Sequence, residues 1–224
     1  MQQWEEAQAA LEEAVAVAER LDLGPFLRVP TLTRLCMHWA VAGQWEAASR
    51  YAMKAIILRK SADAALIQRD FYAHYETEAL LHAGDERQAK EAVHRLGERL
   101  LSNRRFRIPY LLSLAVLADW QGLGSQAIAH LREAAGLAAE IGLPEEQWQI
   151  QARLAKLYEA GGEPAQARLA WVKASTIIQR LTQGIKDETL RARFLAGPQI
   201  HPVLQQAEPE ASPLSRDHAE QEER

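Results

Sequence analysis

The sequence Gln3-Trp4-Glu5-Glu6-Ala7 returns forty-one residues later as Gln44-Trp45-Glu46-Ala47-Ala48. Weaker copies follow around Ala89, Ala127 and Ala167. Self-similarity at a period of this length is typical of repeat proteins, in which each unit buries its apolar face only against its neighbours. The sequence therefore predicts an array of helical repeats, an architecture that argues against a free-standing enzyme.

Glycines mark the period at Gly43, Gly84, Gly122 and Gly162, which lie 38 to 41 residues apart. An alanine follows each glycine by five residues, and a second residue, mostly small, comes two helical turns later on the same face. These pairs are Ala48 and Ala55, Ala89 and Leu96, Ala127 and Ala134, and Ala167 and Ala174. Small side chains there let another helix pack closely, so each period predicts an antiparallel helical hairpin.

Small residues also recur seven positions before each glycine, at Cys36, Thr77, Ala115 and Ala155. Together with the alanine pairs, this spacing resembles the tetratricopeptide repeat family, whose usual period is about 34 residues. The match covers residues 2–182 and departs from the family at Leu96, where a small residue is usual, and at Glu76, where an apolar one is usual. The resemblance implies an all-α fold, a right-handed α-solenoid of tetratricopeptide-like hairpins with a C-terminal capping helix.

The pattern divides the chain into four regions. Residues 1–23 match only a second helix, residues 24–184 hold four hairpins, residues 185–206 form a cap, and residues 207–224 are Pro-, Glu- and Ser-rich and are predicted to be disordered. Because the first half repeat lacks its partner helix, we expect Trp4, Leu11 and Val15 to form an uncovered apolar flank. This suggests that the chain is the C-terminal piece of a longer protein.

The predicted cap begins with Asp187 and carries Leu190, Phe194 and Leu195 as one apolar stripe, which we expect to cover the last hairpin. The segment resembles the end of tetratricopeptide arrays attached to bacterial signalling ATPases of the STAND type, nucleotide cyclases and LuxR-type transcription regulators. That resemblance implies a regulatory or sensor module that receives a protein signal for an upstream effector.

Composition narrows the class of partner. The 224 residues carry a formal charge of −4 with acids and bases interspersed, so no whole-molecule field favours nucleic acid or a membrane. A single cysteine, Cys36, excludes an internal disulfide framework, and no apolar run reaches eighteen residues. We expect a cytoplasmic protein.

Signatures of common enzymes are absent: the sequence has no GxxxxGK[ST], GxSxG or HExxH motif. The segment Gly122-Leu123-Gly124-Ser125-Gln126-Ala127 fits GxGxxA but joins two predicted helices, whereas a dinucleotide site needs a preceding strand. Cys36 occupies a packing position and is expected to be an inert buried thiol. We predict no catalytic residue and no cofactor.

His74, Glu78 and His82 share one helix face, which raises the possibility of a metal site. The two histidines lie about 12 Å apart along the axis, however, while zinc bonds are near 2 Å. One ion could use only an adjacent pair, so we predict no metal and interpret this face as a polar groove wall.

The resemblance implies that the first helix of each hairpin lines a concave groove. Because only Lys156 there is basic, recognition of a chaperone carboxylate tail is not expected. A protein or peptide with an apolar or amphipathic segment fits better, with Trp120, Phe71 and Met37 as anchors; the alternative is that these aromatics belong to the core. The predicted groove residues are Met37, Phe71, His74, Glu78, His82, Leu112, Val116, Asp119, Trp120, Lys156 and Glu159.

One segment concentrates basic residues, namely Arg95, Arg99, Arg104, Arg105 and Arg107 with Phe106 among them. Arginine forks suit phosphate, but these residues straddle a helix end and a turn, so we expect a solvated turn and no nucleic-acid partner. Two alternatives to a heterologous binding module remain. One is self-association through the flank near Trp4, and the other is an enzyme site around His74, Glu78, His82 and Asp119.

Overall fold

A computed structural model of the chain describes residues 2–60, 71–98 and 103–207. These residues form helices and connecting turns, with no strand among them. The predicted tail lies outside the described residues except for Ala207, and so does Arg99. The helices are α1 (Gln2–Arg20), α2 (Pro25–Val41), α3 (Trp45–Lys60), α4 (Ala73–His82), α5 (Glu86–Glu98), α6 (Arg104–Trp120), α7 (Gly124–Ile141), α8 (Pro144–Ala160), α9 (Pro164–Gln183), α10 (Glu188–Leu195) and α11 (His201–Ala207).

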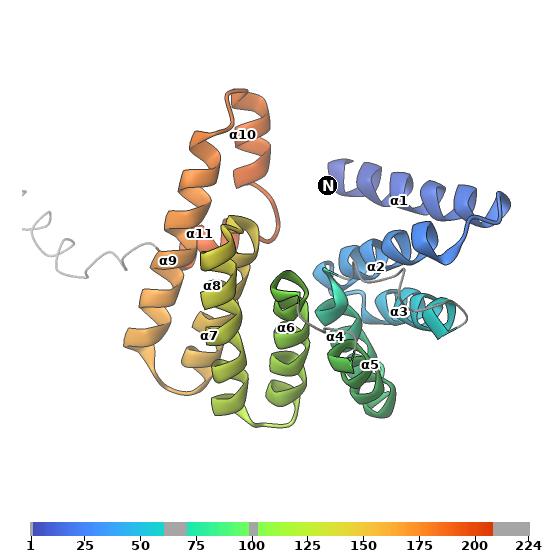
Figure 1. The fold of residues 1–224 in the computed structure, drawn as a ribbon. Coiled ribbons are helices and arrows are strands. Elements are labelled where there is room, and N and C mark those ends of the chain that lie inside the picture. Colours follow the sequence, from blue (N-terminus) through green and yellow to red (C-terminus); the bar gives the residue numbers. More distant parts are fainter. Residues whose placement is uncertain (1, 61–70, 99–102, 208–224) are drawn as a thin grey trace, which may run out of the picture. The chain divides into compact units, whose positions relative to one another are not determined.

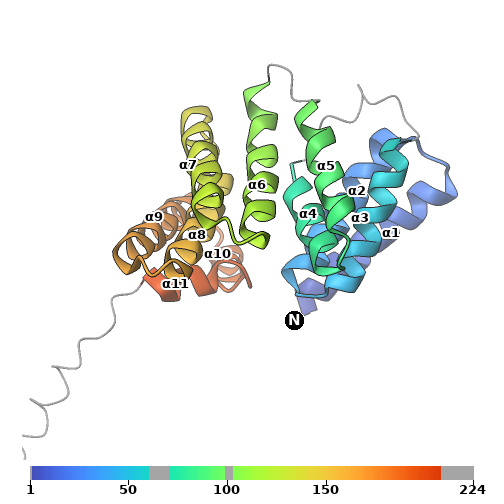
Figure 2. The same cartoon turned by 90° about the horizontal axis from the view of Figure 1, so that it is seen from below.

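The chain divides into two compact units, residues 1–142 and 143–224. In the first unit α1 packs on α2, and the pairs α2 and α3, α4 and α5, and α6 and α7 are antiparallel hairpins (Figures 1 and 2). In the second unit α8 and α9 form the hairpin, and α10 and α11 contact α9. The predicted all-α class built from repeated helical hairpins is confirmed.

The glycines that mark the period share one turn geometry. Gly43 has φ of 72°, its N–H donates to the Ala40 carbonyl (3.0 Å), and the N–H of Gln44 donates to the Trp39 carbonyl (2.9 Å). Gly84, Gly122 and Gly162 repeat this pattern with φ between 72° and 79°. A side chain is disfavoured at such positive φ, which explains why glycine closes each first helix.

The small residues of the second helices are fully buried, as at Ala48, Ala127 and Ala174. Leu96 is the exception and is half-buried. Its neighbour Gly97 makes the close approach in its place, since a Cβ there would lie 2.9 Å from Cε2 of Tyr110 on α6. A close approach between α5 and α6 therefore occurs at Gly97, one residue after Leu96.

The first helix differs from our expectation of an uncovered flank. The Trp4 ring stacks on His38 of α2 with centroids 3.9 Å apart, Val15 is buried, and Leu11 packs in the same cluster as Val15. These side chains face α2, because the apolar stripe of α1 finds its cover on the following helix. The exposed positions of α1 include the two small residues of the repeat pattern, Ala7 and Ala14.

The cap also differs in detail. Helix α10 is capped as predicted, since the Asp187 carboxylate accepts the N–H of Leu190 (2.8 Å), but it contains no buried residue and Leu190 is exposed. The buried side chains beyond α9 are Ile200 and Val203. The buried apolar cover of α9 therefore comes from the segment around α11, whereas in α10 Leu190 is exposed and Phe194 and Leu195 are half-buried.

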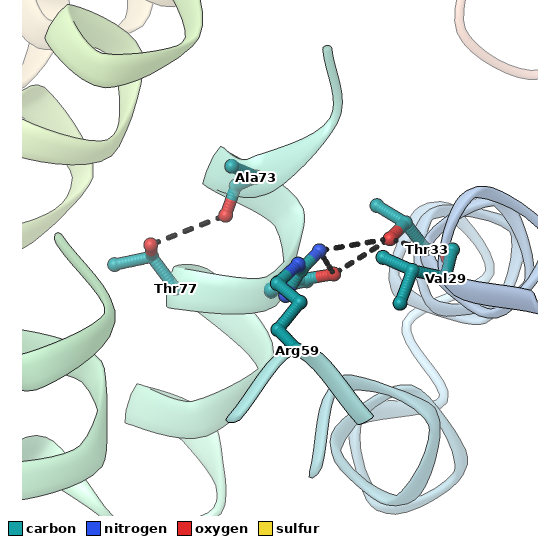
Figure 3. A network of polar contacts seen from close by, with 6 residues as sticks. Val29, Thr33, Arg59, Ala73 and Thr77 are labelled. Atoms are coloured by element: carbon teal, nitrogen blue, oxygen red, sulfur yellow. Dashed lines mark hydrogen bonds and ion pairs between the residues drawn. The ribbon is translucent and has the colours of Figure 1, made fainter. Parts of the chain in front are cut away.

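A buried polar network joins α2, α3 and α4 (Figure 3). Arg59 makes two parallel hydrogen bonds to Glu76, Nη1 to Oε2 at 2.7 Å and Nη2 to Oε1 at 2.8 Å, and Thr33 Oγ1 donates to Oε1 at 2.8 Å. Arg59 Nη2 also donates to Thr33 Oγ1 (3.2 Å). Glu76 is thus stabilised in the interior, at a position where the sequence resemblance implies an apolar residue, because its charge is paired with that of Arg59.

Candidate functional site

Three aromatic side chains of the first unit contact one another in a line, with His82 between Trp45 and Trp120. We call these three residues the aromatic row. The rings of Trp45 and His82 stack with centroids 3.9 Å apart and an interplanar angle of 10°. His82 then meets Trp120 edge to face, with centroids 5.3 Å apart at 71°. Trp120 is 49 % exposed, so a large aromatic surface is held in place and open to solvent.

Helix direction explains how the row forms. Trp45 begins α3, His82 ends α4, and Trp120 ends α6. The first helices of successive hairpins run the same way and each second helix runs back, so these three helix ends meet at one side of the first unit. The leucine that follows the α6 turn, Leu123, is 42 % exposed and is a second exposed apolar side chain at this end of the hairpin.

The structure separates the predicted groove residues by burial. His74 and Leu112 are buried and contribute to packing. Met37, Phe71, Glu78 and Val116 are half-buried, and Met37 and Val116 pack against the core cluster around Cys36 and Leu80. The exposed members are His82, Asp119 and Trp120 in the first unit and Lys156 and Glu159 in the second.

The face that carries His74 and His82 is not one polar wall. His74 is buried beside the Tyr75 ring, at a centroid distance of 4.2 Å, whereas His82 is exposed within the aromatic row. In the described part of the chain no group of three or more His, Cys, Asp or Glu side chains is placed to hold a metal ion. His82 is therefore best described by its ring contacts.

Phe71 is covered by residues of α6 rather than open to a partner. Its ring stacks on Phe106 with centroids 5.6 Å apart, and the Arg105 guanidinium lies over it at 4.4 Å. Aromatic stacking and a cation–π contact both use the ring faces. Of the predicted anchors, Trp120 alone keeps half of its surface exposed.

Three arginines of the predicted basic segment, Arg95, Arg104 and Arg107, form ion pairs with glutamates of α5 and α7. Arg107 Nε donates to Glu133 of α7 (2.7 Å), and Arg104 pairs with Glu140 of the same helix. Arg95 pairs with Glu91 one turn earlier in α5 (2.5 Å). Arg104 and Arg107 thus link α6 to α7, whereas Arg95 pairs within α5.

A polar cavity of about 40 Å³ lies beside the buried network. Its lining includes Arg59, Glu76, Thr77, Arg95 and Ser113. Thr77 and Ser113 donate their hydroxyl protons to carbonyls of their own helices, at 3.2 and 2.9 Å. At about 10–15 Å³ per water, the volume holds a few water molecules, which is too little for an organic substrate.

Cys36 is fully buried, and burial followed by the nearby Glu76 carboxylate raises its thiol pKa well above the usual value. A thiol in such surroundings stays protonated and is a poor nucleophile.

In the second unit, Glu159 accepts the indole N–H of Trp171 (2.6 Å), while Lys156 points to solvent.

Sequence reasoning missed Trp45 and Leu123. Trp45 stands in the repeated motif but was not among the predicted groove residues, and its ring forms the inner end of the row. The antiparallel hairpin was the available signal, because it brings the start of α3 to the end of α4.

No helix in the described ranges is both long and apolar enough to cross a membrane. No protein-family model matches the chain, and no curated protein matches it. Among solved structures, the crystal structure of BtubC (BKLC) from P. vanneervenii is similar with a TM-score of 0.57 and 16 % sequence identity, covering 99 % of this chain and 93 % of that one. At this identity the likeness supports the helical repeat fold alone.

Proposed function

We propose that the chain is a non-catalytic interaction module of the tetratricopeptide type, which binds a segment of another protein through the exposed ends of its first helices. The observation that carries this proposal is the aromatic row, in which Trp120 is 49 % exposed on a rigid helical support. Exposed tryptophans held in place by neighbours are typical energetic centres of protein interfaces. The row takes the place of the broader groove expected from sequence.

Selection of peptides displayed on phage against the full chain tests this function. Selected peptides should lose at least about tenfold in affinity for Trp120→Ala, since a central tryptophan commonly contributes 2 kcal/mol or more. The matched control is Ile57→Ala, which removes a 61 % exposed apolar side chain of α3 in the same unit. Binding that tolerates Trp120→Ala, or equal losses in both variants, would refute the proposal.

By its resemblance to arrays attached to bacterial signalling ATPases, cyclases and LuxR-type regulators, the module serves as the regulatory part of a larger cytoplasmic protein. The polypeptide encoded immediately upstream in the native gene tests this assignment. A nucleotide-binding or DNA-binding segment there supports it, and an unrelated reading frame with a native start at Met1 counts against it.

Self-association is the second candidate, and one observation favours it. Ala7 and Ala14 of α1 are exposed, whereas the equivalent alanines of α3, Ala48 and Ala55, are fully buried by a packed helix. A copy of the chain could supply the missing helix contact. Light scattering over a concentration range distinguishes the candidates, because a mass that stays monomeric eliminates self-association.

A further inference from the structure

We propose that the protein associates head to tail, with the outer face of α9 in one copy docked on the outer face of α1 in a second copy. This inference goes beyond peptide binding by the aromatic row and uses other residues. It specifies the contact for the second candidate function, self-association. Three observations support it: an exposed apolar patch on α9, an uncovered apolar stripe on α1, and opposite charges beside the two faces.

The apolar patch of α9 consists of Leu169 and Val172, which are 50 % and 42 % exposed. The two side chains are three residues apart and are therefore neighbours on one face of the helix. The opposite face of α9, with Ala174 and Ile178 fully buried, packs within the second unit. Adjacent exposed apolar side chains of this size provide a surface that association can remove from water.

The α1 helix carries an apolar stripe whose members alternate at spacings of three and four residues. They are Ala7, Ala10, Ala14, Val17 and Leu21. The alanines are exposed, Val17 is half-buried, and Leu21 is 61 % exposed. The same spacing in α9 holds Ala167, Ala170, Ala174, Ile177 and Leu181, and there the three alanines are buried where α9 packs within the second unit. The chain thus covers this pattern with a packed helix in α9 and leaves it open in α1.

Shape favours the α9 patch as the occupant of the α1 stripe. The small side chains of the stripe let another helix approach α1 closely, and Leu169 and Val172 supply larger side chains that can pack between them. The two helices also have matching lengths of 19 and 20 residues, about 28–30 Å. A second copy of the chain therefore provides an apolar face of suitable size for the open stripe.

Charges beside the two faces are opposite in sign. Glu6 and Glu13 flank the α1 stripe and are exposed. The α9 helix carries Arg168, Lys173 and Arg180, all exposed, and no acidic residue. None of these five side chains forms an ion pair within the described ranges. The two glutamates are seven residues apart, as are Lys173 and Arg180, so each pair spans about 10.5 Å of its helix and two ion pairs can form together. Two α1 helices face to face would instead bring like charges together, because α1 has five glutamates and one arginine.

Sedimentation velocity of the full chain over a concentration range tests the head-to-tail contact. Leu169→Asp blocks the α9 face and Ala14→Arg blocks the α1 face, and both positions are exposed, so circular dichroism should show an unchanged fold. The wild type should associate, and each variant alone should do so at least about tenfold more weakly. An equimolar mixture of the two variants should form a heterodimer, because each copy keeps one intact face.

Charge variants test the complementarity separately. Glu13→Lys should weaken association of the full chain by roughly 3- to 10-fold, and the loss should shrink as salt is added. The matched control is Glu5→Lys, which makes the same charge change at an exposed position on the opposite side of α1 and should have little effect. Equal losses in both variants would attribute association to overall charge and overturn the proposal.

Three other results would also overturn the proposal. Association that survives Leu169→Asp but not Ala14→Arg would indicate a symmetric contact of α1. A wild type that stays monomeric, or a mixture of the two blocked variants that does, would show that α9 does not dock on α1. Loss of association in Trp120→Ala would assign self-association to the aromatic row. None of the α1 and α9 variants alters Trp120, so the display experiment decides peptide binding by the row separately.

Discussion

The first unit contains arginine–glutamate pairs in two settings. Arg59 and Glu76 lie in the interior and join α3 to α4, with Glu76 only 3 % exposed, while Arg107 and Glu133 lie on the surface and join α6 to α7. The closest guanidinium-to-carboxylate distances in the two settings are similar, 2.7 Å for Arg59 and Glu76 and 2.5 Å for Arg107 and Glu133. The difference teaches that burial, and not geometry, decides what such a pair contributes, since bulk water cannot solvate an interior charge that loses its partner as it solvates a surface charge.

Replacing Glu76 by Ala should have the largest effect on stability. The variant leaves the Arg59 guanidinium buried without its bidentate carboxylate. Loss of one partner of a buried pair costs roughly 3–5 kcal/mol, so the urea midpoint should fall strongly. A midpoint within error of the wild type would mean that water reaches Arg59 through the adjacent cavity.

Removing both charges should recover most of that loss. In the double variant Arg59→Leu, Glu76→Leu no buried charge remains, and such replacements are often neutral or stabilising by about 1–4 kcal/mol relative to the intact pair. We expect the urea midpoint of the double variant to lie well above the midpoint of Glu76→Ala. A double variant as unstable as Glu76→Ala would indicate that shape at α3 and α4, rather than charge, controls this site.

Thr33→Val should have an intermediate effect. The substitution keeps the volume but removes the hydroxyl that donates to Glu76 (2.8 Å) and accepts from Arg59 (3.2 Å). Its loss should cost about 1–2 kcal/mol of unfolding free energy. Thr176→Val is the matched control, because Thr176 is half-buried in the second unit and donates only to the carbonyl of Val172 in its own helix.

The buried imidazole of His38 tests, through pH, the cost of placing a charge in the interior. Burial lowers its pKa, with Glu12 opposing the shift, and its Nε2 has no hydrogen-bond partner within the described residues. The unfolded chain therefore protonates His38 more readily than the folded chain does. The free energy of unfolding keeps the full contribution of neutral His38 above about pH 6.5 and loses it as the pH falls below that value. Between neutral and mildly acidic pH, the melting temperature should fall less for His38→Phe than for the wild type. An identical loss in both proteins would place the acid sensitivity in other groups.

Arg107→Ala should have the smallest effect. Its side chain is 56 % exposed, and exposed pairs contribute about 0–1 kcal/mol, less at high salt. The difference in melting temperature between the wild type and this variant should be small at low salt and should vanish at high salt. A loss close to that of Glu76→Ala would contradict the contrast between interior and surface pairs.

Much of the fold could be predicted from sequence because its determinants are local. The glycines at positive φ and the alanines two turns apart were visible as a period, and the helices begin and end near them. Glu76 was visible as a departure from the repeat pattern, but its partner Arg59 lies in another helix and no local spacing indicates that contact.

The candidate site was predicted only in part. Sequence reasoning identified Trp120, His82 and Asp119, which are exposed, but it also included His74 and Leu112, which are buried. Helical periodicity gives the face on which a residue lies, but how deeply that face is covered depends on the neighbouring helices. Trp4 shows the same difficulty, since an expected open flank is closed by His38 of α2.

The sequence by itself determined the repeat, the helical hairpins and the glycine turns between them, because backbone conformation and amphipathic spacing act over a few residues. The tertiary structure alone decided which charges are paired inside and which tryptophan stays open. Those properties depend on how helices from different hairpins approach one another. The Glu76 carboxylate is stabilised in the core by Arg59, and Trp120 is accessible because the residues packed around it leave 49 % of its surface exposed.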